Sequence, residues 1–514
     1  MKRYFLGIDI GTFESRGILI DESFRVAADA SLPHGMDNPQ PGWFEQEAET
    51  VWWGDLCKLC RTLIKQSGIR PEQIACVGTS ALGTDCLPVD EQCRPLRPAI
   101  LYGIDARASE EAAWLTEHYG QARVQELFGH PICSGDTATK ILWLRRHEPE
   151  IYAKTAYFLT GSSFLTARLT GKYVIDQSFA KGSFRPLYQA DGSVNEAECG
   201  LYCRPDQIAA CAWSTDVVGT VTPEAAAQTG LAAGTPVITG TGDSTAEAIS
   251  VGLVEPGTAF FQYGSSMFYY YCTDHFVGSY VSPQGNGALK GGKAFTVPGT
   301  YCLGDGTNAA GTLTRWVRDL LYSKELDAEK QGGENAYAVM AREAAAVPPG
   351  SDGLIMLPYI YGERSPLQDA EATGMLFGLK GTHGRAQINR AALEAVGYST
   401  YQHLLLFEEL GVPPRRIITA GGGTKNAAWM QIICDMAGMP LTIPEPFQCS
   451  SYGDAMLAAL GVGALESFAA LRAALPQGRI LQPDRKNHEF YQEHYPIFRD
   501  LYLENRDRMH RMQK

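Results

Sequence analysis

The loop Asp9-Ile10-Gly11-Thr12 is the first stretch of the sequence whose residue types suit phosphate chemistry. It ends a run of apolar residues that is typical of a β-strand. A glycine there lets the backbone approach a phosphate closely, and consecutive N–H groups can surround an anion. The Thr12 hydroxyl can donate to a phosphate oxygen, and the Asp9 carboxylate can hold a hydrated Mg²⁺. An ordinary hairpin with a structural aspartate is the alternative interpretation.

Two further glycine loops suit the same kind of ligand. Gly264-Ser265-Ser266 lies between two apolar runs in the second half of the chain, as the first loop does in the first half. The run Gly421-Gly422-Gly423 precedes Thr424-Lys425-Asn426 and separates an expected strand from an expected helix. Successive glycines allow a flat ligand, such as a nucleoside, to lie against the backbone. A plain hairpin and a flexible helix entry are the respective alternatives.

Asp243 is the best candidate for a catalytic base. It stands in Gly240-Thr241-Gly242-Asp243-Ser244, where an expected strand meets the start of a helix. A helix start favours a negative charge, and a loop at a strand end can present a carboxylate to a ligand. Transfer of a phosphoryl group to an alcohol needs such a base. The alternative role is that of a helix N-cap.

Several common motifs are absent or incomplete. Residues 287–294 nearly match the GxxxxGK[ST] phosphate loop, but Ala294 replaces the required hydroxyl and no helix pattern follows. A hairpin loop is expected there instead. No GxGxxG follows an expected strand and no GxSxG occurs, which argues against a Rossmann dinucleotide site and a hydrolase nucleophile. The pair Cys57 and Cys60 lies on an expected helix without further metal ligands, so packing is expected for it.

Composition and charge narrow the class of protein. The 514 residues carry a formal net charge of −13, with 45% hydrophobic and 20% charged residues. An acidic chain of ordinary globular composition is not expected to bind nucleic acid or an anionic membrane. No apolar run reaches the roughly 18 residues of a membrane span. With 13 cysteines and no secretory signal pattern, a cytoplasmic protein with reduced thiols is expected.

The loops require strands and helices to position them. Strand–turn–strand patterns occur at residues 4–21 and 259–272, and further strands are expected at 74–80, 236–240 and 416–419. Helices are expected at 45–66, 108–119, 138–146, 162–169, 243–251, 309–321, 334–346, 387–410, 427–436 and 454–460. The chain thus predicts two α/β domains that open alike. We expect domains at 1–250 and 251–465, with a helical C-terminal extension at 466–514.

The order of motifs resembles the FGGY carbohydrate kinases of the actin–hexokinase–heat-shock ATPase superfamily. The shared stretches include GIDIGT (7–12), TGTGDSTAEAISVG (239–252), LPYIYGERSP (357–366) and TAGGGTKNAAWMQIICD (419–435). The resemblance covers most of the chain. It implies an α/β fold of two duplicated ribonuclease H-like (actin-type ATPase) domains with an inter-domain cleft that holds Mg-ATP.

The resemblance also implies residue roles. Asp243 takes the position of the catalytic aspartate, and Asp9 with Asp243 would hold Mg²⁺. Phosphate and nucleotide contacts are implied for Gly11, Thr12, Gly264, Ser265, Gly311, Arg315, Gly421, Gly422, Gly423 and Asn426.

The substrate is less defined than the chemistry. Xylulokinases place Gln-Met-His where this chain has Leu82-Gly83-Thr84, followed by Asp85, and the Arg-Glu pair of glycerol kinases is also missing. A polyol site needs several hydrogen-bonding side chains, because an unpaired buried hydroxyl is costly. The candidates are Asp85, Asp105, Arg107, Asp243 and Ser244, with Tyr102 as an apolar wall of the site. A salt bridge between Asp105 and Arg107 at a helix start is the alternative for that pair.

These observations favour an ATP-dependent kinase of a small sugar or polyol, most simply a pentulose, phosphorylated at a terminal hydroxyl. Kinases of a tetritol, glycerol or gluconate and a degenerate ATP-binding scaffold are the alternatives. A chaperone-type ATPase would need a separate substrate domain, and a periplasmic sugar receptor would need a signal peptide. The expected partners are the sugar and ATP, with a homodimer left open.

Overall fold

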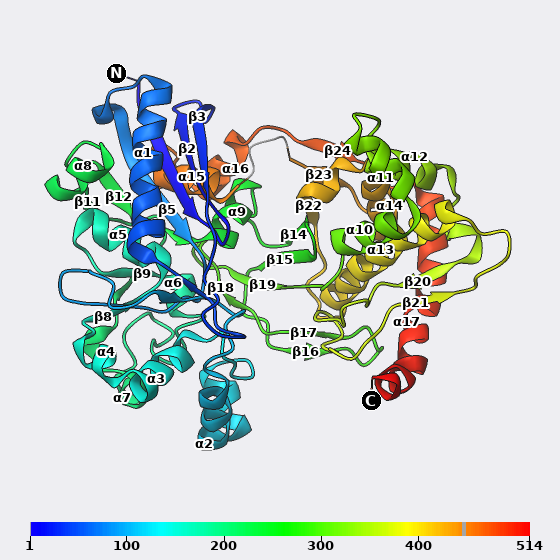
Figure 1. The fold of residues 1–514 in the computed structure, drawn as a ribbon, viewed down its shortest axis with the longest axis horizontal. Helices are drawn as coiled ribbons and strands as arrows, with labels where there is room; N and C mark the ends of the chain where they lie inside the picture. Colours follow the sequence, from blue (N-terminus) through cyan, green and yellow to red (C-terminus); the bar gives the residue numbers. More distant parts are fainter. Residues whose placement is uncertain (1, 445–448, 514) are drawn as a thin grey trace. The chain divides into compact units, whose positions relative to one another are not determined.

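The computed structural model describes residues 2–444 and 449–513, which form two compact units (Figure 1). The first comprises Met1–Val254, Lys293–Tyr301 and Phe447–Leu475, and the second comprises Glu255–Gly292, Cys302–Pro446 and Pro476–Lys514. The main division lies next to the predicted boundary at 250. The packing units differ from the predicted continuous ranges at 293–301 and 447–475, which belong to the first unit although they follow residue 250.

The first unit is built on one twisted sheet with the strand order β11-β12-β5-β1-β2-β3. Strands β1 and β5 are parallel, as are β5 and β12, whereas β2, β3 and β11 run antiparallel to their neighbours. The short strand β13 also pairs with β5 in parallel. The strands of this sheet are β1 (Tyr4–Ile10), β2 (Glu14–Asp21), β3 (Val26–Pro33), β5 (Ile74–Ala81), β11 (Val217–Thr220), β12 (Pro236–Ile238) and β13 (Thr241–Gly242).

Helices and short strands complete the first unit. Its helices are α1 (Gly54–Ser67), α2 (Ser109–Leu127), α3 (Thr137–His147), α4 (Pro149–Lys154), α5 (Gly161–Thr170), α6 (Gln177–Ala180), α7 (Glu196–Tyr202), α8 (Pro223–Thr229), α9 (Asp243–Ser250), α15 (Ser450–Gly461) and α16 (Phe468–Ala474). Its short strands are β4 (Glu45–Gln46), β6 (Leu87–Val89), β7 (Ala99–Ile100), β8 (Tyr157–Leu159), β9 (Val174–Asp176), β10 (Ala210–Ala212) and β18 (Lys293–Ala294).

The second unit repeats the plan of the first. Its sheet contains the order β19-β15-β14-β22-β23-β24, in which β14, β22 and β23 are parallel and the pairs β14–β15 and β23–β24 are antiparallel. Its strands are β14 (Thr258–Tyr263), β15 (Met267–Thr273), β16 (Tyr280–Val281), β17 (Ala288–Leu289), β19 (Tyr301–Gly306), β20 (Ile355–Leu357), β21 (Met375–Phe377), β22 (Arg416–Ala420), β23 (Leu441–Ile443) and β24 (Arg479–Leu481). Its helices are α10 (Gly311–Leu321), α11 (Ser323–Lys330), α12 (Ala336–Ala346), α13 (Arg385–Glu409), α14 (Ala427–Ala437) and α17 (Arg485–Met512). The matching strand order and direction confirm the expected duplication.

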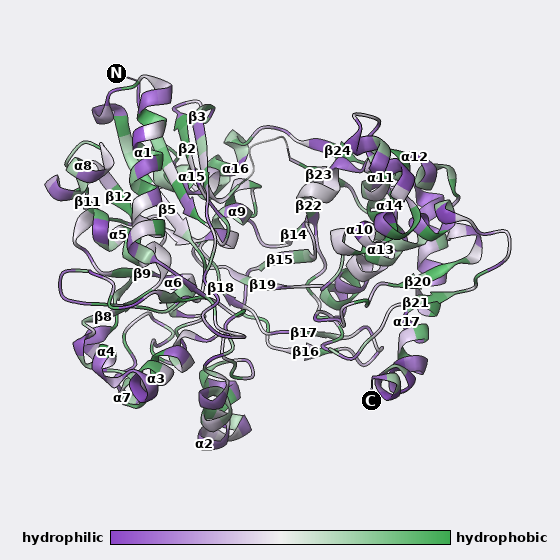
Figure 2. Ribbon diagram, viewed as in Figure 1, coloured by the Kyte–Doolittle hydropathy of each residue, from purple (hydrophilic) through white to green (hydrophobic). Residues whose placement is uncertain are grey.

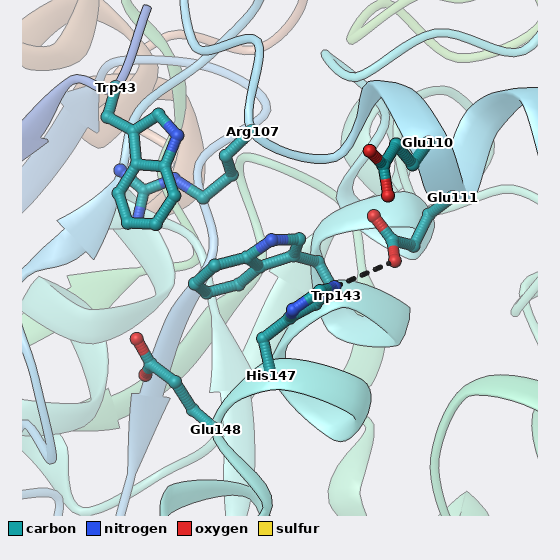
Figure 3. Close-up of a pocket in the computed structure, with 7 residues that line it drawn as sticks. All are labelled: Trp43, Arg107, Glu110, Glu111, Trp143, His147 and Glu148. Atoms are coloured by element: carbon teal, nitrogen blue, oxygen red, sulfur yellow. Dashed lines mark hydrogen bonds and ion pairs between the residues drawn. The ribbon is translucent and has the colours of Figure 1, made fainter. Parts of the chain in front are cut away.

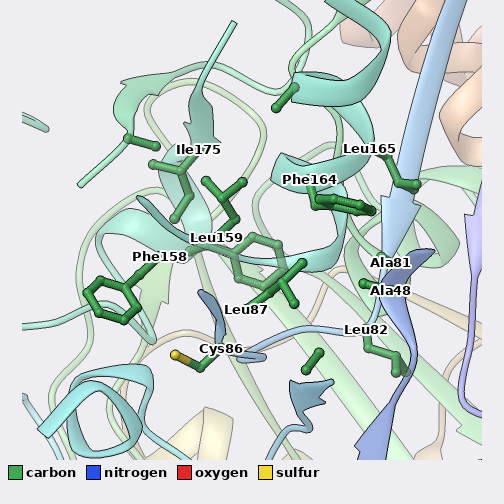
Figure 4. Packing of buried hydrophobic residues seen from close by; sticks show 14 of the residues in the cluster. Ala48, Ala81, Leu82, Cys86, Leu87, Phe158, Leu159, Phe164, Leu165 and Ile175 are labelled. Carbon is green, nitrogen blue, oxygen red and sulfur yellow. The ribbon is translucent and has the colours of Figure 1, made fainter. Parts of the chain in front are cut away.

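The apolar pattern of the sequence explains the cores. Leu56, Leu59, Cys60 and Leu63 are fully buried along one face of α1, the spacing of an amphipathic helix. Figure 4 shows the neighbouring part of this core, where Leu82, Leu87, Phe158 and Phe164 come from different elements. Hydrophilic residues dominate the C-terminal end of α17 in Figure 2, consistent with its surface position.

Three local predictions need correction. The helix expected at 45–66 begins later: Glu45–Gln46 is strand β4 paired with β7, residues Ala48–Trp53 form a π-helix, and α1 starts at Gly54. The loop expected at 287–294 contains the short strands β17 and β18. The C-terminal extension is interrupted by β24, so it is not helical throughout.

The cysteine pair of α1 packs as expected. Cys60 is fully buried and Cys57 is nearly so, and both thiols are free. Burial raises the pKa of Cys57 to about 11 and that of Cys60 further, which disfavours the reactive thiolate. Within the described residues, no helix is long and apolar enough to cross a membrane.

Candidate active site

The carboxylates of the first unit meet where its parallel strands end. In the sheet, Asp9 of β1 is paired with Ser80 of β5, and Ser80 is paired with Thr241 of β13. Helix α9 starts two residues later at Asp243. Ends of adjacent parallel strands lie at one edge of a sheet, and this edge is the usual ligand position in open α/β sheets. The predicted Asp9 and Asp243 are thereby brought together.

Asp243 is the first residue of α9 and is partly exposed. The preceding Gly242 is the N-cap, and no side chain caps the helix, so the N-cap role considered for Asp243 is not what the structure shows. The Ser244 N–H donates to Asp243 Oδ1 over 2.5 Å. Burial raises the pKa of Asp243, although Ser244 and the charge of Lys293 lower it. A carboxylate with a raised pKa is a stronger base than an ordinary one.

Asp9 carries negative charge that the described side chains do not neutralise. Ser80 Oγ lies 2.7 Å from Asp9 Oδ1. Burial, followed by the charges of Asp243 and Glu247, raises the pKa of Asp9 to about 7, although the hydrogen bond from Ser80 lowers it. Two carboxylates that repel each other favour a bound cation between or beside them.

The arrangement suits a hydrated divalent cation rather than a closed metal cage. Among the described residues, no group of three or more His, Cys, Asp or Glu side chains could hold a metal ion. Mg²⁺ commonly keeps several waters and uses one or two carboxylates together with substrate phosphates. Asp9 and Asp243 fit that donor set.

Glu247 is a functional candidate that the sequence analysis missed. It lies one helical turn after Asp243 on α9, and burial followed by the charge of Asp243 raises its pKa to about 7. The signal was available in the sequence, because residues i and i+4 of a helix share a face.

Asp85 is completely buried, and neither of its carboxylate oxygens has a hydrogen-bond partner among the described residues. Burial and Asp243 raise its pKa well above the ordinary value, whereas the charge of Lys140 and the Gly161 amide lower it. The Lys140 Nζ itself donates to the backbone oxygens of Thr84 and Gly135. The partly exposed Gly83 and Thr84 precede Asp85.

Thr12 and Tyr102 lie beside each other in the same region. The Thr12 Oγ1 and the Tyr102 Oη are 3.2 Å apart, and both residues are partly exposed. Asp243 and Asp85 both raise the pKa of Tyr102 after burial does, which places its ring near these carboxylates. The turn itself explains the glycine at position 11. The Gly11 N–H donates to the Glu14 carbonyl, and a Cβ would lie 2.8 Å from that oxygen.

Asp105 and Arg107 form a buried ion pair. Arg107 donates to both oxygens of Asp105 and to Glu45, and Asp105 also accepts the Phe44 N–H. In Figure 3 the guanidinium of Arg107 lies against the ring of Trp43, 4.3 Å from its centroid, in a pocket also lined by Trp143. Their hydrogen-bonding capacity is used within the chain, which favours the salt-bridge alternative over sugar contact.

The turn after β14 in the second unit is held by backbone hydrogen bonds to the start of α10. Gly264 and Ser265 are exposed, and their carbonyls accept the N–H groups of Ala310, Gly311 and Thr312 at the start of α10. A Cβ on Gly311 would lie 2.5 Å from the Gly264 oxygen. Thus Gly264, Ser265 and Gly311 lie together, while the exposed Arg315 follows one turn later on α10.

The three glycines of the loop after β22 differ in how closely the protein packs around them. Gly421 has a φ of +92°, and a Cβ there would lie 2.6 Å from the Tyr263 oxygen. A Cβ on Gly423 would lie 2.8 Å from the Tyr263 side chain, whereas a Cβ on the exposed Gly422 would meet nothing within 4 Å. Asn426 caps α14 by accepting the Trp429 N–H. The protein's own packing therefore explains Gly421 and Gly423 but not Gly422.

Comparison with known proteins agrees with this arrangement. The profile of the "FGGY family of carbohydrate kinases, N-terminal domain" matches residues 4–250, and that of the C-terminal domain matches residues 263–462. The chain belongs to the FGGY family of carbohydrate kinases. It is therefore a carbohydrate kinase, and the family implies ATP as its phosphoryl donor.

The similar proteins are kinases of different sugars. The chain is 29% identical to the xylulose kinase of Escherichia coli (strain K12) over 501 residues, covering 97% of this chain and 98% of that protein. It is 28% identical to the gluconokinase of Bacillus subtilis (strain 168) over 506 residues, covering 98% and 96%. The crystal structure of xylulose kinase from Rhodospirillum rubrum superposes with a TM-score of 0.88 at 28% identity, covering 99% of this chain and all of that one.

Proposed function

We propose that this carbohydrate kinase transfers the γ-phosphoryl group of Mg-ATP to a terminal hydroxyl of a small neutral sugar, most simply a pentulose, with Asp243 as general base. The observation that carries the proposal is the state of Asp243. Asp243 is partly exposed as a residue, lies at the ends of the parallel strands, and has a carboxyl group whose pKa is raised. These are the properties needed to accept a proton from an alcohol near neutral pH.

The base can act only if the sugar hydroxyl lies beside it. Thr12, Tyr102 and Ser244 are partly exposed polar residues of the same region, and they can hold other hydroxyls of the sugar. Orientation by such contacts converts the attack of the hydroxyl on the phosphorus into an effectively unimolecular step. A terminal primary hydroxyl offers the least hindered in-line approach.

ATP is assigned to the glycine loops of the second unit. Gly422 is exposed and has open space where a side chain would stand, so the backbone there can lie flat against an adenine ring. Gly264, Ser265 and Gly311 cluster at the turn after β14, where the Ser265 hydroxyl can donate to a phosphate oxygen. The contact of Arg315 with the nucleotide, and that of Asn426 with the ribose, belong to the same proposal.

Asp9 and Asp243 are the residues that would hold Mg²⁺, through its waters. Bound there, the ion would screen the charge of the phosphates. The repulsion between the Asp9 and Asp243 carboxylates contributes to the raised pKa of Asp9. This supports the assignment, because a bound cation would relieve the repulsion.

The charge of the sugar region favours a neutral substrate over an aldonate. The charge of Asp243 raises the pKa of Asp85, and a substrate carboxylate would add further negative charge to this region. Because the chain is similar to both a xylulose kinase and a gluconokinase, the similar proteins do not distinguish a neutral sugar from an aldonate as the substrate. The acidic surroundings support the neutral sugar in this proposal, and we expect glycerol to be too short to contact both Asp85 and Asp243. Because Asp85 is fully enclosed, its direct contact with a sugar would require movement of the Gly83–Thr84 turn.

The test is coupled ADP release over ketopentoses, ketohexoses, tetritols, pentitols, gluconate and glycerol. We expect a neutral ketose or polyol to give the highest kcat/KM. Gluconate or glycerol as the best substrate would overturn the neutral, longer-chain assignment. Absence of sugar-dependent ADP release with every compound, in a protein that still binds ATP, would support the degenerate scaffold instead.

A further inference from the structure

Helix α15 brings a buried carboxylate from the far end of the chain to the predicted Mg²⁺ residue. This helix packs against β1, β5 and α9 of the first unit (Figure 1). The fit is close, since a Cβ on Gly7 of β1 would lie 1.8 Å from the Ser451 oxygen. Asp454 of this helix is completely buried, and the sequence analysis gave it no role.

A single hydroxyl joins Asp454 to Asp9. Ser80 Oγ lies 2.6 Å from Asp454 Oδ2 and 2.7 Å from Asp9 Oδ1. A serine hydroxyl has one proton, so it can donate to only one of the two carboxylates. The other short contact requires a proton that belongs to a carboxyl group.

Asp454 is the better site for that proton. Its Oδ1 has no hydrogen-bond partner among the described residues. The groups that act on it are Asp9 on β1 and Asp243 on α9, which are acidic, and Ser80 on β5; burial raises its pKa well above the usual value. Asp9, by contrast, is partly exposed and receives a second stabilising hydrogen bond from Ser450.

We propose that Asp454 is a positioning residue of the kinase reaction: its carboxylic acid donates to Ser80 Oγ, and the Ser80 hydroxyl in turn donates to Asp9. The chain fixes the direction of the serine proton and therefore the orientation of the Asp9 carboxylate. Because Asp454 is completely buried, we assign it a role through Ser80 and not through contact with a substrate. The inference rests on the proposed role of Asp9 in holding hydrated Mg²⁺.

The test combines four variants with kinetics at varied Mg²⁺. Asp454→Asn keeps a donor for Ser80 Oγ, so its kcat should remain within about threefold of the wild type. Asp454→Ala should lower kcat at least tenfold and raise the Mg²⁺ requirement, with the sugar KM within twofold. Ser80→Ala should reproduce this loss. The double variant Asp454→Ala/Ser80→Ala should lose no more than twofold beyond Ser80→Ala, because the two residues act in series.

Two readouts do not depend on turnover. Infrared spectroscopy in D₂O at neutral pH should show the carbonyl band of un-ionised carboxyl groups in the wild type. The difference spectrum between the wild type and Asp454→Asn should contain the part of this band that belongs to Asp454, because the other buried carboxyls are the same in both proteins. Calorimetric titration with Mg-ADP should show weaker binding in Asp454→Ala and Ser80→Ala than in Asp454→Asn. If Asp454→Ala does not fold, the proposal is tested by the kinetics of Ser80→Ala and by the infrared comparison of the wild type with Asp454→Asn.

A matched control separates positioning from stability. Asp435 is another buried aspartate, in the second unit, where it accepts hydrogen bonds from Gln431, Asp484 and Asn487. Asp435→Ala should lower the melting temperature without changing the Mg²⁺ requirement.

The inference and the proposed function can fail separately. A wild type that turns over no sugar would defeat the function, while the infrared and Mg-ADP experiments would still report on Asp454. An active wild type with an unchanged band in Asp454→Asn, or with normal Mg²⁺ dependence in Asp454→Ala, would overturn the inference. Additive losses in the double variant would also overturn it.

Discussion

The two units share a strand order but differ in the side chains at the ends of their parallel strands. In the first unit these ends carry Asp9 and Asp243. The charge of Glu247 raises the pKa of Asp9, and that of Asp243 raises the pKa of Asp85. In the second unit β14, which matches β1 in the strand order, is followed by Gly264-Ser265-Ser266, and β22, which matches β5, is followed by Gly421-Gly422-Gly423. Neither of these short loops contains a carboxylate.

This difference separates two kinds of chemistry on one repeated scaffold. A cluster of carboxylates can remove a proton and hold a cation, but it repels phosphates. Glycines and hydroxyls can approach a polyphosphate without repelling it. We infer that duplication supplied two equivalent strand ends and that the residues placed there divided the work, with proton transfer on the first unit and nucleotide binding on the second.

Removal of the base should give the largest effect. Asp243→Asn keeps the size and the hydrogen bond from Ser244 but loses basicity, so kcat should fall about 10²–10⁴-fold. ATP binding should persist. Steady-state ADP release and calorimetry with Mg-ADP measure the two effects. Asp484→Asn is the matched control, since Asp484 caps α17 in the second unit, and it should leave kcat within twofold. A kcat of Asp243→Asn within threefold of the wild type would refute the assignment.

A side chain at Gly422 should give the next largest effect, on the other unit. Because a Cβ there meets no protein atom within 4 Å, Gly422→Val should fold normally and raise the KM for ATP at least tenfold, with the sugar KM nearly unchanged. Gly381→Val is the control, because that glycine also has open space around it. A folded Gly422→Val enzyme with a normal ATP KM would show that the nucleotide does not bind at this loop.

The comparison also shows what the sequence could predict. The duplicated fold was predictable because the apolar runs and the Gly-hydroxyl turns are local patterns, and the strand ends fix the place of Asp9 and Asp243. The family resemblance was confirmed, whereas the individual site roles stay predictions.

Other features depend on contacts between distant residues and left no local signal. Asp454 lies 374 residues after Ser80, and only the packing of α15 on β1 and β5 joins them. The sequence placed that helix in the second domain because it follows the glycine loop along the chain. Likewise, the ion pair of Asp105 with Arg107 could be stated only as an alternative, because its partners Glu45 and Phe44 lie about 60 residues away.

Asp85 tests whether the charge of the first unit selects the sugar. Asp85→Ala should lower kcat/KM for the neutral sugar at least tenfold, with the ATP KM nearly unchanged. Asp85→Asn keeps the shape but removes an ionisable carboxyl near Asp243, so the ratio of kcat/KM for the neutral sugar to that for gluconate should fall. The check is this ratio, measured in parallel for the wild type and for Asp85→Asn. An unaltered ratio in Asp85→Asn, with normal activity of Asp85→Ala, would mean that Asp85 does not select the substrate.

The smallest effect is expected from a buried carboxyl of the second unit that lies outside its glycine loops. Glu363 accepts the N–H groups of Asn308 and Arg364 through Oε1, its Oε2 has no partner among the described residues, and burial raises its pKa to about 8. A folded-state pKa above the ordinary value means that the folded protein binds the proton more tightly than the unfolded chain. The resulting stabilisation is complete below about pH 4.5 and is lost as the pH rises through about 8.

The melting temperature should therefore fall between pH 6 and pH 9, and Glu363→Gln should make that fall smaller by a few degrees, since the amide cannot ionise. Calorimetric scans at the two pH values measure the difference. Glu493→Gln on the exposed face of α17 is the control and should follow the wild type. An equal fall in Glu363→Gln and the wild type would show that Glu363 does not titrate in this range. Asp9 and Glu247 of the first unit, whose pKa values are raised to about 7, would then remain among the described carboxyls expected to titrate near neutral pH, which would sharpen the contrast between the two halves.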